Sequence, residues 1–267
     1  MGLAERFFRG SLVLLVAGLA ASAGYAQDAD VQQQLSNPIS ALTLLPIQVN
    51  YDQGIGPAED GTKITTNIQP VIPFKLGDGL SLVSRTIVPI ISQDEIFPGA
   101  GDQFGFGDSL QSLFFVPPTV DGFTWGAGPA ILLRTGTDEL LSTGKWAAGP
   151  TAVALQQTGP WTIGILANHL WSFARDEDRA DVSSSFVQPF ISYGASGGWT
   201  YTLNAESTYN WETDQWSVPI NFQISKLTKF GDQPVSITGG IRYWAESPED
   251  LGPEGWGGRV ALTFIFP

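Results

Sequence analysis

The chain contains few side chains suited to covalent chemistry. His169 is its only histidine and it has no cysteine, so an acid–base pair built on His169 is the enzymatic chemistry to consider. Alternation places His169 on one strand face with Trp161 and Trp171, and Ser185 on the next run could lie diagonally near it. A Ser–His pair there would suit a lipid hydrolase, but no G-x-S-x-G sequence accompanies it. We favour an interfacial histidine and no enzymatic activity.

Acidic residues cluster between 176 and 181, where carboxylate oxygens could hold a divalent cation. The spacing of Asp176, Glu177, Asp178 and Asp181 matches no EF-hand, and arginines interrupt the run. The glycine-rich stretches lack a following helix, which argues against a phosphate cradle. We therefore expect a solvated acidic loop, no metal site and no cofactor.

The more informative polar residues recur at every second position. In WTYTLNAESTYNW, residues 199–211, the set from Trp199 to Trp211 is apolar, while Asn204 and Glu206 share the polar set. A period of two is typical of a β-strand with two different faces. The bulky rings stand at the ends of the apolar face and smaller side chains in its middle, which is unlike the core face of a soluble sandwich.

The same alternation recurs along most of the chain and defines twelve expected strands. They lie near 44–53, 62–76, 80–92, 105–117, 122–135, 145–157, 160–174, 183–195, 199–211, 216–227, 234–246 and 256–266. The connections after even-numbered strands are tight, and most of those after odd-numbered strands are longer. Most of the 26 acidic residues lie in or beside the odd-numbered connections, so the two ends of the sheet face different environments.

These features predict an all-β fold, a transmembrane antiparallel up-and-down β-barrel of about 12 strands. A soluble strand usually has about 5–6 residues, whereas a membrane-spanning one needs about 9–11, with aromatic girdles at both interfaces. Only a closed sheet leaves no backbone group unpaired in lipid. We expect the chain in a bacterial outer membrane, with the lipid bilayer and a small-molecule solute as its partners.

The N-terminus predicts export. Arg6 and Arg9 precede the apolar run 12–21, and a small-x-small site ends at Ala26, which is typical of a secretory signal peptide. We expect cleavage after Ala26, with Ala23 as the alternative. The predicted organisation is a signal peptide at 1–26, an N-terminal periplasmic segment at 27–43 and a barrel at 44–267. The formal net charge of −13 argues against nucleic-acid binding, which needs a basic surface.

The inward set and the interfacial aromatics are the candidate site residues. The predicted lumen-lining residues are Lys63, Asn67, Gln69, Arg85, Arg134, Asn204, Glu206, Asn221, Gln223, Arg242, Glu246 and Arg259. The predicted membrane-interface aromatics are Trp161, Trp171, Phe173, Trp199, Tyr201, Tyr209, Trp211, Trp216, Phe264 and Phe266. The polar set either lines a selective conduit or fills the bore as a closed ion-pair network, and both interpretations stand at this point.

Seven prolines fall inside the expected strands. Each removes a ladder donor, and a closed barrel has no edge to accommodate it. We predict bulges or rim positions at several of them. The seven are Pro70, Pro73, Pro89, Pro129, Pro150, Pro189 and Pro219.

Several segments resemble a bacterial family. They include NPISALTLLPIQ, SRTIVPIISQ, GKWAAGPTAVALQQTGPW and NHLWSFARDEDRADV, and the similarity extends over nearly all of the mature chain. The family is the outer-membrane transporter family named after the MetA pathway of phenol degradation, some members of which are mislabelled neuromedin U. The resemblance implies an outer-membrane barrel that takes up small hydrophobic or aromatic compounds, and it supplies no catalytic residues. A narrow passive conduit is the favoured function, with a plugged structural or surface-interaction barrel as the alternative and a lipid hydrolase behind both.

Overall fold

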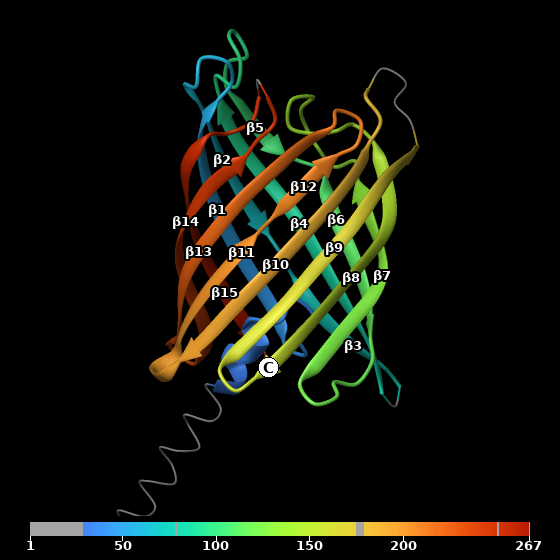
Figure 1. The fold of residues 1–267 in the computed structure, drawn as a ribbon, viewed down its shortest axis with the longest axis vertical. Helices are drawn as coiled ribbons and strands as arrows, with labels where there is room; N and C mark the ends of the chain where they lie inside the picture. Colours follow the sequence, from blue (N-terminus) through green and yellow to red (C-terminus); the bar gives the residue numbers. More distant parts are fainter. Residues whose placement is uncertain (1–28, 78, 175–178, 250, 267) are drawn as a thin grey trace, which may run out of the picture.

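The computed structural model describes residues 29–77, 79–174, 179–249 and 251–266. The predicted signal peptide and the acids Asp176, Glu177 and Asp178 lie outside these described residues. The described chain forms one closed antiparallel β-barrel with its strands tilted against the long axis (Figure 1). Among the described residues, no helix has the length and apolar character needed to span a bilayer.

Fifteen strand segments build the described wall. They are β1 (Thr43–Ile55), β2 (Gly61–Ile68), β3 (Val71–Gly77), β4 (Leu80–Asp94), β5 (Gln103–Phe106), β6 (Ser109–Val116), β7 (Phe123–Leu133), β8 (Trp146–Thr158), β9 (Trp161–Ala174), β10 (Ser183–Ala195), β11 (Trp199–Ala205), β12 (Ser207–Asn210), β13 (Gln215–Phe230), β14 (Gln233–Glu246) and β15 (Gly255–Phe266). Three predicted strands are each interrupted once, which gives the pairs β2–β3, β5–β6 and β11–β12. The segments therefore form twelve crossings of the wall, and the predicted fold class is confirmed.

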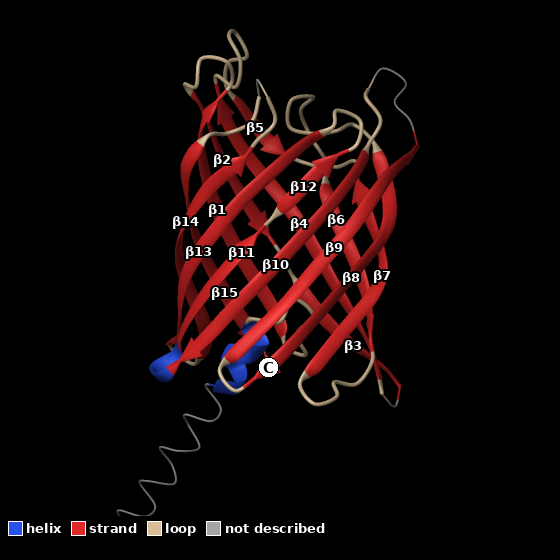
Figure 2. Cartoon of the chain, in the orientation of Figure 1, coloured by secondary structure: helices blue, strands red, loops and turns tan. Residues whose placement is uncertain are grey.

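The sheet closes between its first and last strands. β1 pairs antiparallel with β15, in a register that sets Thr43 opposite Phe266 and Tyr51 opposite Gly258. Tight turns gather at one end of the barrel and the longer loops at the other (Figure 2). Because outer-membrane barrels carry short periplasmic turns and longer external loops, the tight-turn end is the periplasmic one.

Several prolines coincide with irregular pairing, as predicted. The chain leaves the strand at Pro70, between β2 and β3, and the β13–β14 register shifts beside Pro219. Pairing of β8 with β9 skips Pro150, and pairing of β6 with β7 skips Pro129. Pro73 and Pro189 lie in continuously registered stretches. Pro89 is also registered, and its carbonyl accepts from Gly107 at the break between β5 and β6.

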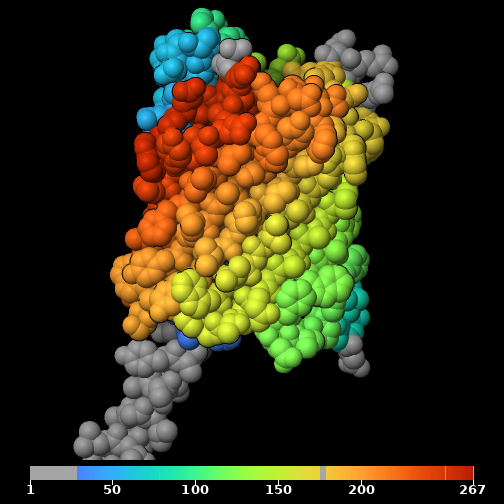
Figure 3. Space-filling view, in the orientation of Figure 1, coloured from blue at the N-terminus to red at the C-terminus, as the bar shows by residue number. Residues whose placement is uncertain are grey.

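The outer face is apolar with aromatic residues toward both ends. At the periplasmic end the rings of Trp161 and Tyr193 lie 4.7 Å apart, and near the loops those of Tyr209 and Trp216 lie 4.9 Å apart. Seven further predicted aromatics lie on the same outward face: Trp171, Phe173, Trp199, Tyr201, Trp211, Phe264 and Phe266. The strands of the near side form one wall in the space-filling view (Figure 3), as expected for a surface in lipid.

The segment before β1 enters the barrel instead of lying outside it. Residues 29–35 are helical and lie in the periplasmic mouth. The Gln32 amide donates to the carbonyls of Ala195 and Trp199 at 3.3 and 2.8 Å. Ile39 is 3% exposed and packs in the interior apolar cluster around Phe114. The part of the expected periplasmic segment that the structure describes is thus a plug, because its apolar side chains bury against inward-facing ones.

Candidate functional site

A network of charged side chains covers one side of the lumen. Arg259 of β15 donates through Nη1 and Nη2 to the two oxygens of Glu206 at 2.9 and 2.8 Å, and its Nε donates to Asn50 Oδ1 at 2.7 Å. Arg259 is 2% exposed, so these partners, and not water, stabilise its positive charge. A bidentate guanidinium–carboxylate pair of this kind is among the stronger polar contacts in proteins.

The network continues through Arg242 on β14. Its Nη1 lies 3.8 Å from Glu206 Oε2, and its Nε lies 3.2 Å from Asp52 Oδ1 on β1. Trp244 donates through Nε1 to the same Asp52 oxygen at 2.8 Å, and its ring stacks 4.7 Å from the Arg242 guanidinium. Lys63 of β2 stands opposite Asp52 in the strand register. Three cations and two carboxylates therefore share this wall.

An interruption in the sheet places Glu206. The residue lies in the gap between β11 and β12, and its backbone N–H donates to the carbonyl of Pro219 at 3.0 Å. The proline has no N–H to return to the ladder, and the β13 register shifts there. The local kink leaves Glu206 facing Arg259, two strands beyond the β13 that Glu206 borders. We infer that the register shift at Pro219 helps to set the position of Glu206.

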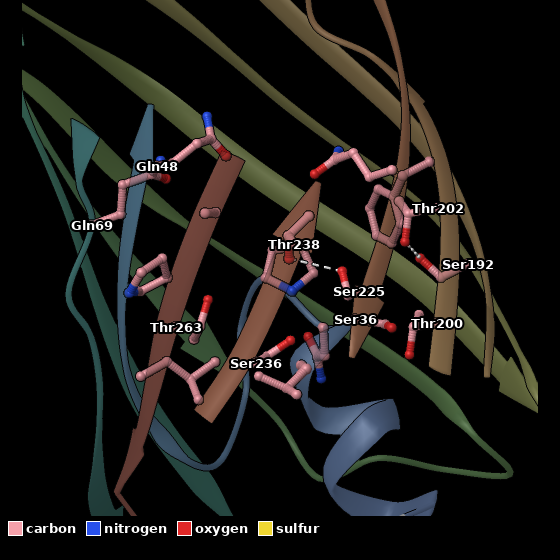
Figure 4. Close-up of a pocket in the computed structure, with 18 of the residues that line it drawn as sticks. Ser36, Gln48, Gln69, Ser192, Thr200, Thr202, Ser225, Ser236, Thr238 and Thr263 are labelled. Atoms are coloured by element: carbon pink, nitrogen blue, oxygen red, sulfur yellow. Dashed lines mark hydrogen bonds between the residues drawn. The ribbon is translucent and has the colours of Figure 1, made fainter. Parts of the chain in front are cut away.

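Two cavities occupy the lumen beside this network. The lower one, of about 230 Å³, lies above the N-terminal plug, with Ser36 at its floor and hydroxyl pairs such as Ser192 with Thr202 on its wall (Figure 4). The upper one, of about 480 Å³, is bordered by Glu206, Arg242 and Arg259. Six residues border both cavities, which therefore lie next to each other: Gln48, Gln69, Arg85, Gln188, Asn204 and Gln223.

The side of the upper cavity formed by β4, β6, β9 and β10 carries both apolar and polar side chains. Its apolar lining consists of Ile87, Leu110, Leu166, Leu170 and Phe186, and its polar lining of Arg85, Ser112, Asn168, Ser184 and Gln188. Lower down, the Phe190 ring lies where a Cβ on Gly164 would approach its Cζ to 2.5 Å, so the glycine makes room for the aromatic side chain. The lumen is thus amphipathic, with an ion-pair network on one side and a mixture of hydrocarbon and polar groups on the other.

Most of the predicted lumen residues come together in this site. Asn67, Gln69, Arg85, Asn204, Glu206, Gln223, Arg242 and Arg259 border the cavities. Asn221 is fully buried and donates to Asn204 Oδ1 at 2.8 Å, and Lys63 lies beside Asp52. Arg134 and Glu246 are exceptions: both are exposed at the loop end, because Arg134 follows the last residue of β7 and Glu246 is the last residue of β14.

The sequence reading missed four polar residues of β1 and β10. Gln48, Asn50 and Asp52 alternate with Ile47, Val49 and Tyr51 on β1, and Gln188 follows the same pattern on β10. Asp52 is the most consequential, since it is 5% exposed and contacts Arg242. The period of two in residues 47–52 was sufficient to identify the three on β1.

His169 and Ser185 lie directly opposite each other in the register, not diagonally as expected. The Ser185 hydroxyl is 2.7 Å from His169 Nδ1 and accepts from Trp211 Nε1 at 2.9 Å. Nε2 of His169 is buried and makes no hydrogen bond within the described chain. A serine nucleophile needs a base oriented by a third group, and the described residues supply none, so this cluster resembles an aromatic belt more than a hydrolytic site.

Within the described ranges, no group of three or more His, Asp or Glu side chains converges on a common point. The lumen carboxylates Asp52 and Glu206 each lie against arginine, which competes with a cation for their oxygens. The site's chemistry is that of polar and charged recognition.

Two solved structures share this fold. The COG4313 outer membrane channel from Pseudomonas putida F1 superposes with a TM-score of 0.67 at 14% identity, over 84% of this chain and 95% of that one. The NanC porin gives 0.53 at 11% identity, over 82% and 98%. No family model matches the chain, and no curated protein matches its sequence. These likenesses concern the fold, which is that of bacterial outer-membrane β-barrels, and the apolar outer face agrees with that location.

Proposed function

We propose that this protein is a passive outer-membrane conduit for small molecules. The observation that carries the proposal is the pair of neighbouring lumen cavities, which share six lining residues. A bore filled by a closed ion-pair network would leave no such space beside the ions. The proposal includes a signal peptide at 1–26, no catalytic step and no cofactor.

The solutes we propose are small and amphipathic, including aromatic compounds. The upper cavity, of about 480 Å³, lies within the range of about 300–1,000 Å³ that accommodates small ligands, and the lower one, of about 230 Å³, lies below it. Apolar side chains line part of the upper cavity. The resemblance of the sequence to the phenol-degradation transporter family supports the same class of solute.

A plugged structural or surface-interaction barrel is the second candidate, and a specific observation favours it. The N-terminal segment fills part of the periplasmic mouth and is anchored by Gln32 and the buried Ile39. The lower cavity nevertheless reaches the plug, with Ser36, Asn37 and Pro38 along its border. The plug therefore narrows the periplasmic end of the path.

Solute flux into liposomes tests the proposal. Full-length protein folded into vesicles should admit small solutes, with larger ones entering more slowly, as followed by light scattering after osmotic shock. A matched control carries Glu212→Gln, a charge change on an exposed loop, and should behave as wild type. Vesicles with folded, protease-protected barrel that admit none of the solutes would favour the plugged alternative.

A further inference from the structure

Arg85 differs from the other lumen arginines in having no ion-pair partner. Its Nη2 donates to the neutral Gln69 amide oxygen at 3.2 Å, and within the described chain no carboxylate oxygen comes within 4.0 Å of it. Glu206 acts on Arg85 only at longer range, because both Glu206 oxygens accept from Arg259. The positive charge of Arg85 is therefore directed into the lumen instead of being locally neutralised.

Arg85 also lies where a passing solute must meet it. It is one of the six residues that border both cavities, and the other five are uncharged amides. In the described structure the side chains of Gln188 and Gln223 make no hydrogen bond, so their amide N–H groups are available as donors. A carboxylate held by Arg85 would meet these donors in a setting partly shielded from bulk water, where charge-assisted hydrogen bonds strengthen.

The net charge of the lumen is positive, like that of Arg85. The cavity borders carry three cations, Arg85, Arg242 and Arg259, against two carboxylates, Asp52 and Glu206, a net +1 that Lys63 beside Asp52 raises to +2. The chain as a whole carries −13. The interior is thus positive within an acidic protein, and a low-dielectric lumen focuses that field on the permeating ion.

The apolar side completes the recognition chemistry. Ile87 lies two residues beyond Arg85 on β4, and Leu166 and Phe186 border the same upper cavity. A solute with a carboxylate at one end and a hydrocarbon body would place its charge at Arg85 and its body against these side chains. We propose that the conduit selects small amphipathic organic anions, with Arg85 and the amides around it as their binding site. This inference rests on the proposed conduit function.

Reversal potentials and block by benzoate test the inference on full-length protein in planar bilayers. In a KCl gradient the wild type should prefer chloride over potassium. Benzoate should reduce the chloride current in a saturable manner, whereas benzyl alcohol, of similar shape without the charge, should not. Arg85→Gln should lower the chloride preference and weaken benzoate block by about 10–100-fold, the loss expected for a charged hydrogen bond. Arg85→Lys should keep much of the ion preference but weaken benzoate block, because lysine lacks the planar fork.

The control removes one positive charge elsewhere. Lys229→Gln, at the exposed periplasmic end of β13, should leave both readouts near wild type. A conducting wild type that prefers potassium, or equal benzoate block in the Arg85→Gln and Lys229→Gln variants, would overturn the inference and leave the conduit standing. Absence of any conductance in verified folded barrels would instead refute the conduit itself, and the inference with it.

Discussion

The two sides of the lumen are stabilised by different kinds of interaction. On the side of β13 to β2, Arg259, Glu206, Arg242 and Asp52 are held by contacts of defined direction between 2.8 and 3.8 Å. On the opposite side, Leu166 and Phe186 contribute area and volume without direction. Loss of one partner leaves an unpaired buried charge in the charged wall, whereas the apolar wall is destabilised in proportion to the side-chain volume removed. The sign of a solute's charge can be read by the charged wall and by Arg85 of β4.

Breaking the bidentate pair should produce the largest effect. Arg259→Met leaves Glu206 partly buried without its main partner, and removing one member of a buried pair costs about 3–5 kcal/mol. The double variant Glu206→Leu/Arg259→Met should recover most of that loss, since no charge is then stranded. Urea unfolding in vesicles measures both. A single variant as stable as Lys229→Met, the matched exposed control, would show that the pair contributes nothing.

Removing volume from the apolar wall should lower the free energy of unfolding slightly less, and the loss should depend on side-chain size. Leu166, 2% exposed, lies in the interior cluster, and Leu166→Ala should destabilise by about 2–5 kcal/mol through lost burial and the resulting cavity. Leu166→Met conserves volume and should cost less than about 1.5 kcal/mol. The same unfolding assay applies. Equal losses for alanine and methionine would mean that the side is not held by packing.

On the outer surface, the cost of a charged substitution should depend on its depth in the membrane. Ile220 and Phe230 both point outward on β13, the first at mid-strand and the second at the periplasmic end. Ile220→Arg should cost about 2–4 kcal/mol and Phe230→Arg about 0–1 kcal/mol, because the penalty for arginine falls from the bilayer centre to the interface. Folding equilibria in vesicles check the gradient. Similar penalties at the two positions would argue against lipid around this face.

Loosening the plug should have a smaller effect on stability than breaking either inner wall. Gln32→Ala removes the amide donor to Trp199 and Ala195, a loss of about 1–2 kcal/mol for bonds of this kind. The lower cavity should then widen and single-channel conductance rise, with Asp30→Ala, exposed on the same helix, as the control. Unchanged conductance in Gln32→Ala with reduced stability would mean that the plug does not obstruct the path.

The strands of the barrel wall could be predicted from the sequence, but the side-chain contacts between distant strands could not. Period-two alternation located all twelve crossings, since each strand faces lipid on one side and the lumen on the other. It could not show that Glu206 reaches Arg259, because that pair bridges strands 53 positions apart in sequence and depends on the kink opposite Pro219. Alternation also placed Arg134 and Glu246 inside, although strand ends carry no signal for where the barrel wall stops.

The N-terminal plug illustrates the same limit. The chain forms a short helix at residues 29–35, before Asn37. Its destination inside the barrel follows from contacts such as Gln32 with Trp199, which no local pattern encodes. Residues that act through distant partners therefore needed the folded chain to be recognised.

Single-channel recording of the full-length protein is the most direct test of the central claim, that a continuous path runs beside the charged wall. Barrels first verified as folded by the gel shift between unboiled and boiled samples should insert into planar bilayers and give discrete, small conductance steps. Those steps should change in size when Glu206→Gln alters the wall and remain unchanged in Glu212→Gln. Folded, inserted barrels without any conductance steps would contradict the account.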